Sequence, residues 1–265
     1  MLNSKTKLCV GLLILALSVP VFTFAQAAQT GGATSASDMK VLQNVEKMLA
    51  DHPSFKNVHP AVEDSIVTLQ GSVDTYHNNL RLHDKVKGVQ GVEGVRNQVQ
   101  VSTEAIPDDQ LAKTLAGKLR YDRVGYGNLF NNLTLQVNDG RVTLGGNVLN
   151  YADRDSALSI VENAKGVTDV TNNIQVARAS FFDDELRIRL ARAIYGSPVL
   201  QRYALDPQAP IRIVVENGHV TLYGAVNNQL DRQVAYLQAR SVPGVFSVDD
   251  QIAIPGDQTN MDQDR

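Results

Sequence analysis

The chain has 265 residues, of which 43% are hydrophobic and 20% are charged, and its formal net charge at neutral pH is −3. This composition is typical of a soluble globular protein that is long enough for more than one packed unit. The acidic balance argues against general nucleic-acid binding, which needs a basic surface to displace counterions, and the single cysteine excludes an intrachain disulfide.

The first 27 residues have the pattern of a secretory signal peptide. Lys5 and Lys7 precede an apolar run over residues 8–25, and Ala25-Gln26-Ala27 provides the small-x-small pattern of a cleavage site. An uncleaved membrane anchor is the alternative, because the run is almost long enough to span a bilayer. Cleavage would remove Cys9 and leave 23 basic and 28 acidic residues, a net charge of −5.

A five-residue pattern, V-T-L-x-G, occurs three times. The copies are VTLQG at Val67–Gly71, VTLGG at Val142–Gly146 and VTLYG at Val220–Gly224. A Gly-Val pair begins 20 residues after the glycine of each copy, at Gly91, Gly166 and Gly244. Self-similarity with periods of 75 and 78 residues predicts three copies of one supersecondary unit.

Each unit opens with a predicted amphipathic helix, because apolar residues recur at three- and four-residue spacing. These residues are Leu42, Val45 and Leu49, then Leu111, Leu115 and Leu119, then Leu186, Leu190 and Ile194. Residue types that begin helices lie just before each stripe, so we expect the helices to start near them. They are Ser37 or Asp38, Pro107-Asp108 and Asp183.

Two antiparallel strands are predicted to follow the opening helix. In the second and third units, alternating apolar runs flank Asp139-Gly140 and Asn217-Gly218, and such dipeptides are strong hairpin signals. The first unit has no turn glycine between residues 60 and 70. We infer its hairpin from its similarity to the other two units.

A second helix and a third strand complete each unit. The helix is predicted from Leu82, Val86 and Val89, from Ala157, Val161 and Ala164, and from Ala235, Ala239 and Val242. Alternating apolar residues after the Gly-Val pair indicate a strand, and a strand-helix-strand sequence implies a right-handed parallel crossover. We therefore predict an α+β fold of three tandem α-β-β-α-β units, each a three-stranded mixed sheet covered on one face by two helices.

This element order, with V-T-L-x-G on the second strand and Gly-Val 20 residues later, resembles the BON domain over about residues 38–254. The resemblance implies a non-catalytic envelope module that binds phospholipid membranes and supports the cell envelope under osmotic or other stress. We expect a periplasmic protein with units at residues 38–103, 107–178 and 181–255. A signal peptide at 1–27 and a disordered tail at 256–265 would flank them.

Six repeated glycines are predicted to be structural. Gly71, Gly146 and Gly224 are expected to end the second strand where the backbone turns into the second helix. Gly91, Gly166 and Gly244 are expected to end that helix with a left-handed cap. Catalytic and metal sites are not predicted. The five histidines lack metal-ligand spacing, and no histidine, aspartate or glutamate occupies an equivalent place in all three units near a catalytic partner. We expect no cofactor.

The units differ between the opening helix and the hairpin, where the second and third have extra residues. These segments carry Tyr121, Tyr126 and Phe130, and then Tyr195, Leu200 and Tyr203. Exposed apolar side chains on loops mark interaction sites. The alternative is that the loops fold back over a sheet edge or a neighbouring unit.

Basic residues cluster on the same helices and loops. They are Lys113, Lys118, Arg120 and Arg123 in the second unit, and Arg187, Arg189, Arg192 and Arg202 in the third. The stripe of the third opening helix predicts Arg187 and Arg189 on its two flanks and Arg192 on its outer face. A cationic helix beside aromatic residues suits an anionic phospholipid surface, although an ordinary solvated helix face has the same composition.

Two functions therefore remain after the sequence is considered. The first is binding to an anionic phospholipid surface through the basic and aromatic residues of the second and third units. The second is a protein-interaction scaffold that presents sheet edges and loops to envelope proteins. The linkers between units are short, so we expect limited motion between them.

Overall fold

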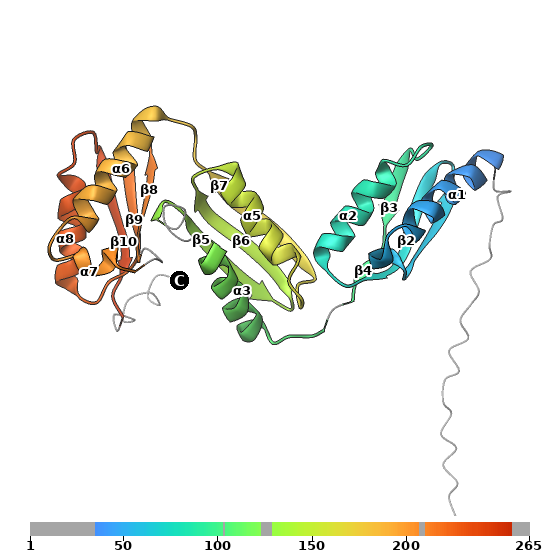
Figure 1. Ribbon diagram of the computed structural model, residues 1–265, viewed down its shortest axis with the longest axis horizontal. Coiled ribbons are helices and arrows are strands. Elements are labelled where there is room, and N and C mark those ends of the chain that lie inside the picture. Colours follow the sequence, from blue (N-terminus) through green and yellow to red (C-terminus); the bar gives the residue numbers. More distant parts are fainter. Residues whose placement is uncertain (1–34, 103, 123–128, 207–209, 256–265) are drawn as a thin grey trace, which may run out of the picture. The chain divides into compact units, whose positions relative to one another are not determined.

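The computed structural model describes residues 35–102, 104–122, 129–206 and 210–255 (Figure 1). The predicted signal peptide, the C-terminal tail, Arg123 and Tyr126 lie outside these residues. Within them, the order α-β-β-α-β occurs three times, which confirms the predicted fold class. None of the helices in these ranges has the length and apolar character needed to cross a membrane.

The first repeat contains a split third strand. Its elements are α1 (Ala36–Ala50), a 3-10 turn (Pro53–Phe55), β1 (Val58–Glu63), β2 (Ile66–Val73), α2 (Tyr76–Lys87), β3 (Gly94–Asn97) and β4 (Gln100–Val101). β2 is central, with β1 antiparallel on one side and with β3 and β4 parallel on the other. The hairpin that we inferred from the other repeats is present, and Asp64 and Ser65 form its turn with positive φ angles.

The second and third repeats have continuous third strands. The second contains α3 (Asp108–Asp122), β5 (Asn132–Asn138), β6 (Arg141–Val148), α5 (Tyr151–Glu162) and β7 (Asp169–Val176). The third contains α6 (Phe181–Tyr195), α7 (Gln201–Ala204), β8 (Ile211–Glu216), β9 (His219–Ala225), α8 (Gln229–Arg240) and β10 (Ser247–Ala253). In both, the second strand is central, antiparallel to the first strand and parallel to the third.

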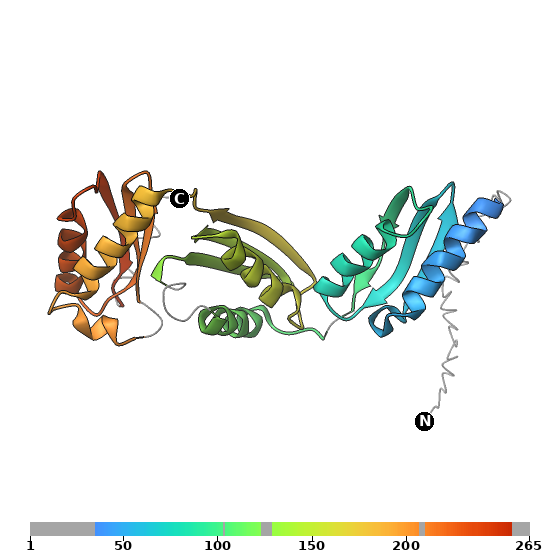
Figure 2. The same cartoon turned by 45° about the horizontal axis from the view of Figure 1, so that its top comes forward.

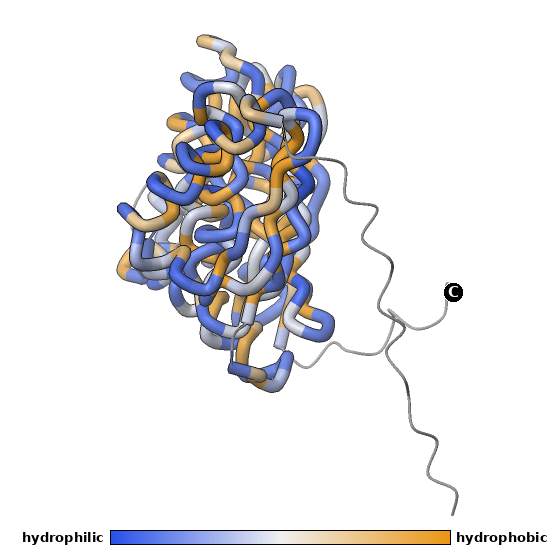
Figure 3. Tube along the Cα trace, turned by 90° about the vertical axis from the view of Figure 1, so that its right-hand side faces the viewer, coloured by the Kyte–Doolittle hydropathy of each residue, from blue (hydrophilic) through white to orange (hydrophobic). Residues whose placement is uncertain are grey.

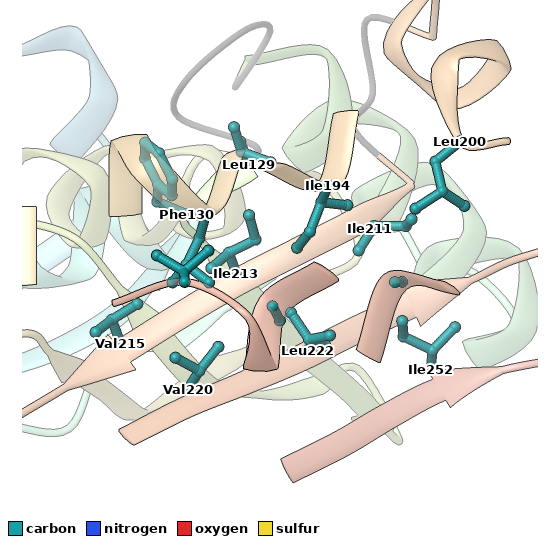
Figure 4. Close-up of a cluster of buried hydrophobic side chains, with 14 of the residues drawn as sticks. Leu129, Phe130, Ile194, Leu200, Ile211, Ile213, Val215, Val220, Leu222 and Ile252 are labelled. Atoms are coloured by element: carbon teal, nitrogen blue, oxygen red, sulfur yellow. The ribbon is translucent and has the colours of Figure 1, made fainter. Parts of the chain in front are cut away.

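Each sheet buries one face against two helices, as the ribbons in Figures 1 and 2 show. Val142 and Leu144 of the repeated pentapeptide are at most 1% exposed, whereas Thr143 between them points to the open face. Hydrophobic and hydrophilic segments alternate along the tube in Figure 3, as expected of elements that bury one side. The core of the third repeat includes Ile213 and Leu222 (Figure 4).

A carboxylate in the first turn of each opening helix holds the hairpin turn of its own repeat. Asp183 accepts hydrogen bonds from the backbone N–H groups of Asn217 and Gly218, at 2.9 and 3.0 Å. Asp38 and Asp108 occupy the equivalent positions and bind the turns of their repeats. The side-chain caps of the first and third opening helices are Ser35 and Ser180, one turn before the predicted Asp38 and Asp183.

The repeated glycines do not end the strands and helices that we predicted them to end. Each strand continues past its glycine, so Gly71, Gly146 and Gly224 do not end the second strand. At Gly146, φ is +91° and an added Cβ would collide with the carbonyl oxygen of Asn132 on the paired strand. Gly166 likewise does not cap α5, because it lies three residues beyond the C-cap residue Asn163, and Gly91 and Gly244 hold the same place in their repeats.

Candidate functional site

Arg187 is not part of an exposed cationic band, contrary to the prediction from the helix stripe. Its side chain is buried, with its guanidinium donating to the carbonyl oxygen of Val215 at 2.7 Å and to a carboxylate oxygen of Asp184 at 2.5 Å. β8 therefore supplies a backbone acceptor that the helix pattern alone could not reveal. Arg187 ties α6 to its sheet.

Tyr195 also has a structural position rather than a place on an exposed loop. Its hydroxyl donates to the carbonyl oxygen of Ile211 at 2.5 Å and accepts from the N–H of the same residue at 3.0 Å. Burial raises the pKa of the Tyr195 hydroxyl well above its ordinary value. Tyr195 thus fixes the end of α6 to the start of β8.

Arg202 and Tyr203 belong to a cluster around Asp231, at the start of α8. The buried Tyr203 hydroxyl donates to Asp231 at 2.6 Å and accepts from the N–H of Asn227 at 2.8 Å. Arg202 forms an ion pair with Asp231, and the hydrogen bond to that carboxylate raises the pKa of Arg202. This part of the loop folds back, as in the alternative to an exposed aromatic loop, but onto the start of α8 in its own repeat and not onto a sheet edge or a neighbouring repeat.

Phe130 is likewise buried and not available on a surface. Together with Leu129 it belongs to the cluster that contains Leu200 and Ile211 (Figure 4). Of the aromatic residues that we predicted on the two loops, Tyr121 remains exposed, at 76%.

Two arginines of α6 remain exposed as predicted. Among the described residues, neither Arg189 nor Arg192 has an ion pair or a side-chain hydrogen bond. The guanidinium of Arg189 lies close to Gly244, in the turn that follows α8. These two side chains are therefore accessible for contact with an anionic surface.

Two of the predicted basic residues of the second repeat, Lys113 and Lys118, line a hollow between α3 and α5. The hollow has a volume of about 760 Å3, and Lys113, Lys118 and Tyr121 line it together with Gly117 and Ile160. No atom lies within 4 Å of the position that a Cβ on Gly117 would occupy. A glycine inside a helix weakens it by about 1 kcal/mol relative to alanine, so Gly117 lines this hollow at a cost to the helix. Arg120, on the same helix, is also exposed.

Three exposed phenylalanines gather at one end of the third repeat, and the sequence reasoning missed them. Phe181 and Phe182 in the first turn of α6 are 71% and 80% exposed, and Phe246 before β10 is 79% exposed. The Asp183 bond to Gly218 brings the two segments together, because the Phe246 ring lies against Gly218. The sequence does contain a sign of this exposed apolar cluster, because Phe246 stands at the position where the other repeats have the polar residues Glu93 and Thr168.

We found no group of three or more metal-ligating side chains within the described ranges that could hold an ion. The hydroxyl groups of Tyr195 and Tyr203, the carboxylate of Asp231 and the guanidinium groups of Arg187 and Arg202 bind one another or the backbone. Their arrangement fixes helices to sheets, and the predicted lipid-binding residues that remain exposed are cations and Tyr121.

Comparisons with known proteins identify the repeated unit. The family model described as BON domain matches residues 37–103, 107–178 and 198–256. Osmotically-inducible protein Y of Escherichia coli (strain K12) is 26% identical over 152 residues, which cover 52% of this chain and 72% of that protein.

Two solved structures show distant likenesses to this chain. The C-terminal domain of CdsD, a structural protein of the type III secretion system of Chlamydia trachomatis, has a TM-score of 0.23 at 15% identity, covering 82% of this chain and 98% of that one. The periplasmic domain of the inner membrane protein PrgH from S. typhimurium has a TM-score of 0.16 at 9% identity, covering 78% and 99%. Neither likeness bears on function at these TM-scores.

Proposed function

This chain belongs to the BON domain family, and on that premise we propose that it is a non-catalytic periplasmic protein that attaches to anionic phospholipid surfaces. The signal-peptide pattern of residues 1–27 supports the location. The name of the relative, osmotically-inducible protein Y, supports a role in the envelope under osmotic stress.

The exposed end of the third repeat formed by Phe181, Phe182 and Phe246 is the observation that carries this proposal. Exposed phenylalanines are unfavourable in water, and each gains about 1.5 to 3 kcal/mol when it is fully buried in an apolar environment. Aromatic rings at the tip of a folded unit can enter the boundary between lipid headgroups and acyl chains without unfolding anything. We call these three residues the phenylalanine tip.

Cations on α6 and just before it supply the preference for anionic lipid. Arg189 and Arg192 on α6 are exposed, and so is Arg178, three residues before Phe181. Each arginine close to an anionic membrane contributes about 1 kcal/mol, which salt reduces. Lys113, Lys118 and Tyr121 around the α3–α5 hollow offer a second cationic and aromatic contact in the neighbouring repeat. Because Arg187 and Arg202 are engaged in the fold, they are left out of this surface.

Co-sedimentation with vesicles of phosphatidylglycerol and phosphatidylcholine tests the proposal. Changing Phe181 and Phe182 together to serine should weaken binding roughly tenfold or more through the loss of buried apolar area. Leu237→Ser is the matched control, since Leu237 is an exposed apolar residue of α8 in the same repeat, 54% exposed. Circular dichroism checks that each variant is folded.

Changing Arg189 and Arg192 together to glutamine separates the electrostatic part from the apolar part. This variant should bind anionic vesicles roughly tenfold more weakly and should show a weaker salt dependence than the unmodified protein. Should the unmodified protein fail to co-sediment with anionic vesicles even at low salt, the lipid proposal is wrong. The alternative, a scaffold that binds envelope proteins, would then take its place.

A further inference from the structure

The open face of the β5–β6–β7 sheet carries an uncharged polar surface. The pairing register places Gln136, Thr143 and Thr171 in one row across the three strands, and Thr134, Gly145 and Asn173 in the next. We call these six residues the polar array. Its rows are about 6.8 Å apart along the strands and its strands about 4.8 Å apart, so it forms a continuous patch of hydroxyl and amide groups.

The side chains of the polar array are not used by the fold. Gln136, Thr134, Thr171 and Asn173 are exposed, and Thr143 is half-buried. Within the described parts of the chain, the five side chains have no hydrogen-bond partner. Every hydroxyl and amide in the array is therefore free to bind something outside the chain.

The equivalent faces of the other repeats are different, so the fold does not require this composition. In the first repeat, the row through Thr68 contains Ala61 and Arg96, and in the third repeat the row through Thr221 contains Val214 and Asp249. Charged and apolar side chains are thus accepted at these positions. The second repeat alone among the three has two successive rows of uncharged polar residues and glycine.

The array also uses residues that are poor strand formers. Asparagine and glycine are depleted in strands because they pack weakly there. Gly145 has no backbone reason to be glycine, since its φ is not positive. An added Cβ would approach the hydroxyl of Thr134, at 2.8 Å, so the missing side chain leaves a notch between Thr134 and Asn173. At Gly145 and Asn173 the sheet thus has residues that strands disfavour, and the surface there is polar and notched.

From these observations we propose that the polar array binds a neutral polysaccharide strand. An anionic lipid surface or a nucleic acid would need cations, and a protein partner would need apolar or aromatic anchors, none of which is present in the two rows. A glycan offers closely spaced hydroxyl and acetamido groups. Threonine hydroxyls and side-chain amides both donate and accept hydrogen bonds, which matches that chemistry.

Titration with a tetramer of N-acetylglucosamine, followed by NMR of the full chain, tests the proposal. Thr143→Val with Thr171→Val removes two hydroxyls while keeping the side-chain shape and the strand preference. This variant should bind the tetramer roughly tenfold more weakly. Thr68→Val with Thr221→Val is the matched control, because these threonines hold the same place in the other V-T-L copies, and it should bind as the unmodified protein does.

Two results would overturn the proposal. One is no binding of the tetramer by the unmodified protein, and the other is equal weakening by the two double variants. Vesicle co-sedimentation of the Thr143 and Thr171 variant should remain unchanged. The glycan site is separate from the phenylalanine tip, so failure of either test leaves the other to be judged on its own result.

Discussion

At the scale of single residues, two glycines of the second repeat have opposite effects. Gly146→Ala should lower the free energy of unfolding by about 2 kcal/mol or more, because alanine would be strained at a φ of +91° and its Cβ would meet the Asn132 carbonyl. Gly117→Ala should raise it by about 1 kcal/mol, because α3 accepts a Cβ there without contact. Urea denaturation measures both, and equal effects of the two changes would contradict the assignment.

Asp38 gives the first repeat a defined dependence on pH. Hydrogen bonds from the Ser65 backbone N–H and from the Ser35 hydroxyl lower the pKa of Asp38 below its ordinary value of 3.8. A carboxyl whose pKa is lowered by folding stabilises the fold above its unfolded pKa and loses that contribution as pH falls through its folded pKa. The stabilisation by Asp38 should therefore be complete above pH 3.8 and decline at lower pH.

Thermal melts of the unmodified protein and of Asp38→Asn test this expectation. The difference in Tm between the two proteins should be largest near neutral pH and should shrink below pH 3.8, where the carboxyl of the unmodified protein becomes protonated. A difference that does not change with pH would show that the Asp38 charge plays no part. The comparison isolates Asp38 because all other carboxyls are common to both proteins.

At the scale of elements, the third strand of each repeat protects its own outer edge. Asp250 on β10 accepts from the N–H of Ile252 at 3.1 Å, and Asn172 on β7 accepts from the N–H of Ile174 at 3.0 Å. Asn97 and Val99 form the same bond in the first repeat, at 3.1 Å. These side chains satisfy backbone donors that an edge strand would otherwise offer to another chain.

The edge residues Asp250 and Asn172 differ in whether an arginine of the neighbouring helix binds them. Arg232 of α8 binds the carboxylate of Asp250 at 2.9 Å, whereas Arg154, at the equivalent place on α5, binds Asp155 instead of Asn172. Asp250→Ala should therefore destabilise the protein by about 2 kcal/mol, since it also removes the carboxylate that Arg232 binds and leaves Arg232 only the backbone carbonyl of residue 250. Asn172→Ala should cost about 1 kcal/mol or less. Chemical denaturation that ranked the two variants in the reverse order would refute the argument.

At the scale of the whole molecule, three copies of one fold carry different surfaces. The buried sides are alike, because valine and leucine of each pentapeptide face two helices. The exposed sides are not, since the third repeat has the phenylalanine tip, and the second has the polar array and the α3–α5 hollow. In the proposals above, the second and third repeats bind different ligands, while the fold common to all three supplies a rigid support.

The fold could be predicted from the sequence because its determinants are local. Helices and strands are indicated by the spacing of apolar residues, and turns by pairs such as Asp139-Gly140, and both signals involve only a few neighbouring residues. Because the unit is repeated, each of these patterns occurs three times in the sequence. Much of the candidate surface could not be predicted, since exposure depends on what packs nearby. Arg189 and Arg187 both flank the α6 stripe, yet only Arg187 meets a β8 carbonyl.

The sequence by itself thus determined the number of repeats, the order of their elements and the side of each strand that is buried. Tertiary structure decided which arginines and tyrosines are engaged, because their partners lie on other elements, as Asp231 does for Tyr203. It also decided that Gln136, Thr143 and Thr171 stand side by side. The alternation of apolar and polar residues predicts which side chains of a strand face away from the core. Only the pairing register, however, brings residues from three strands into one row.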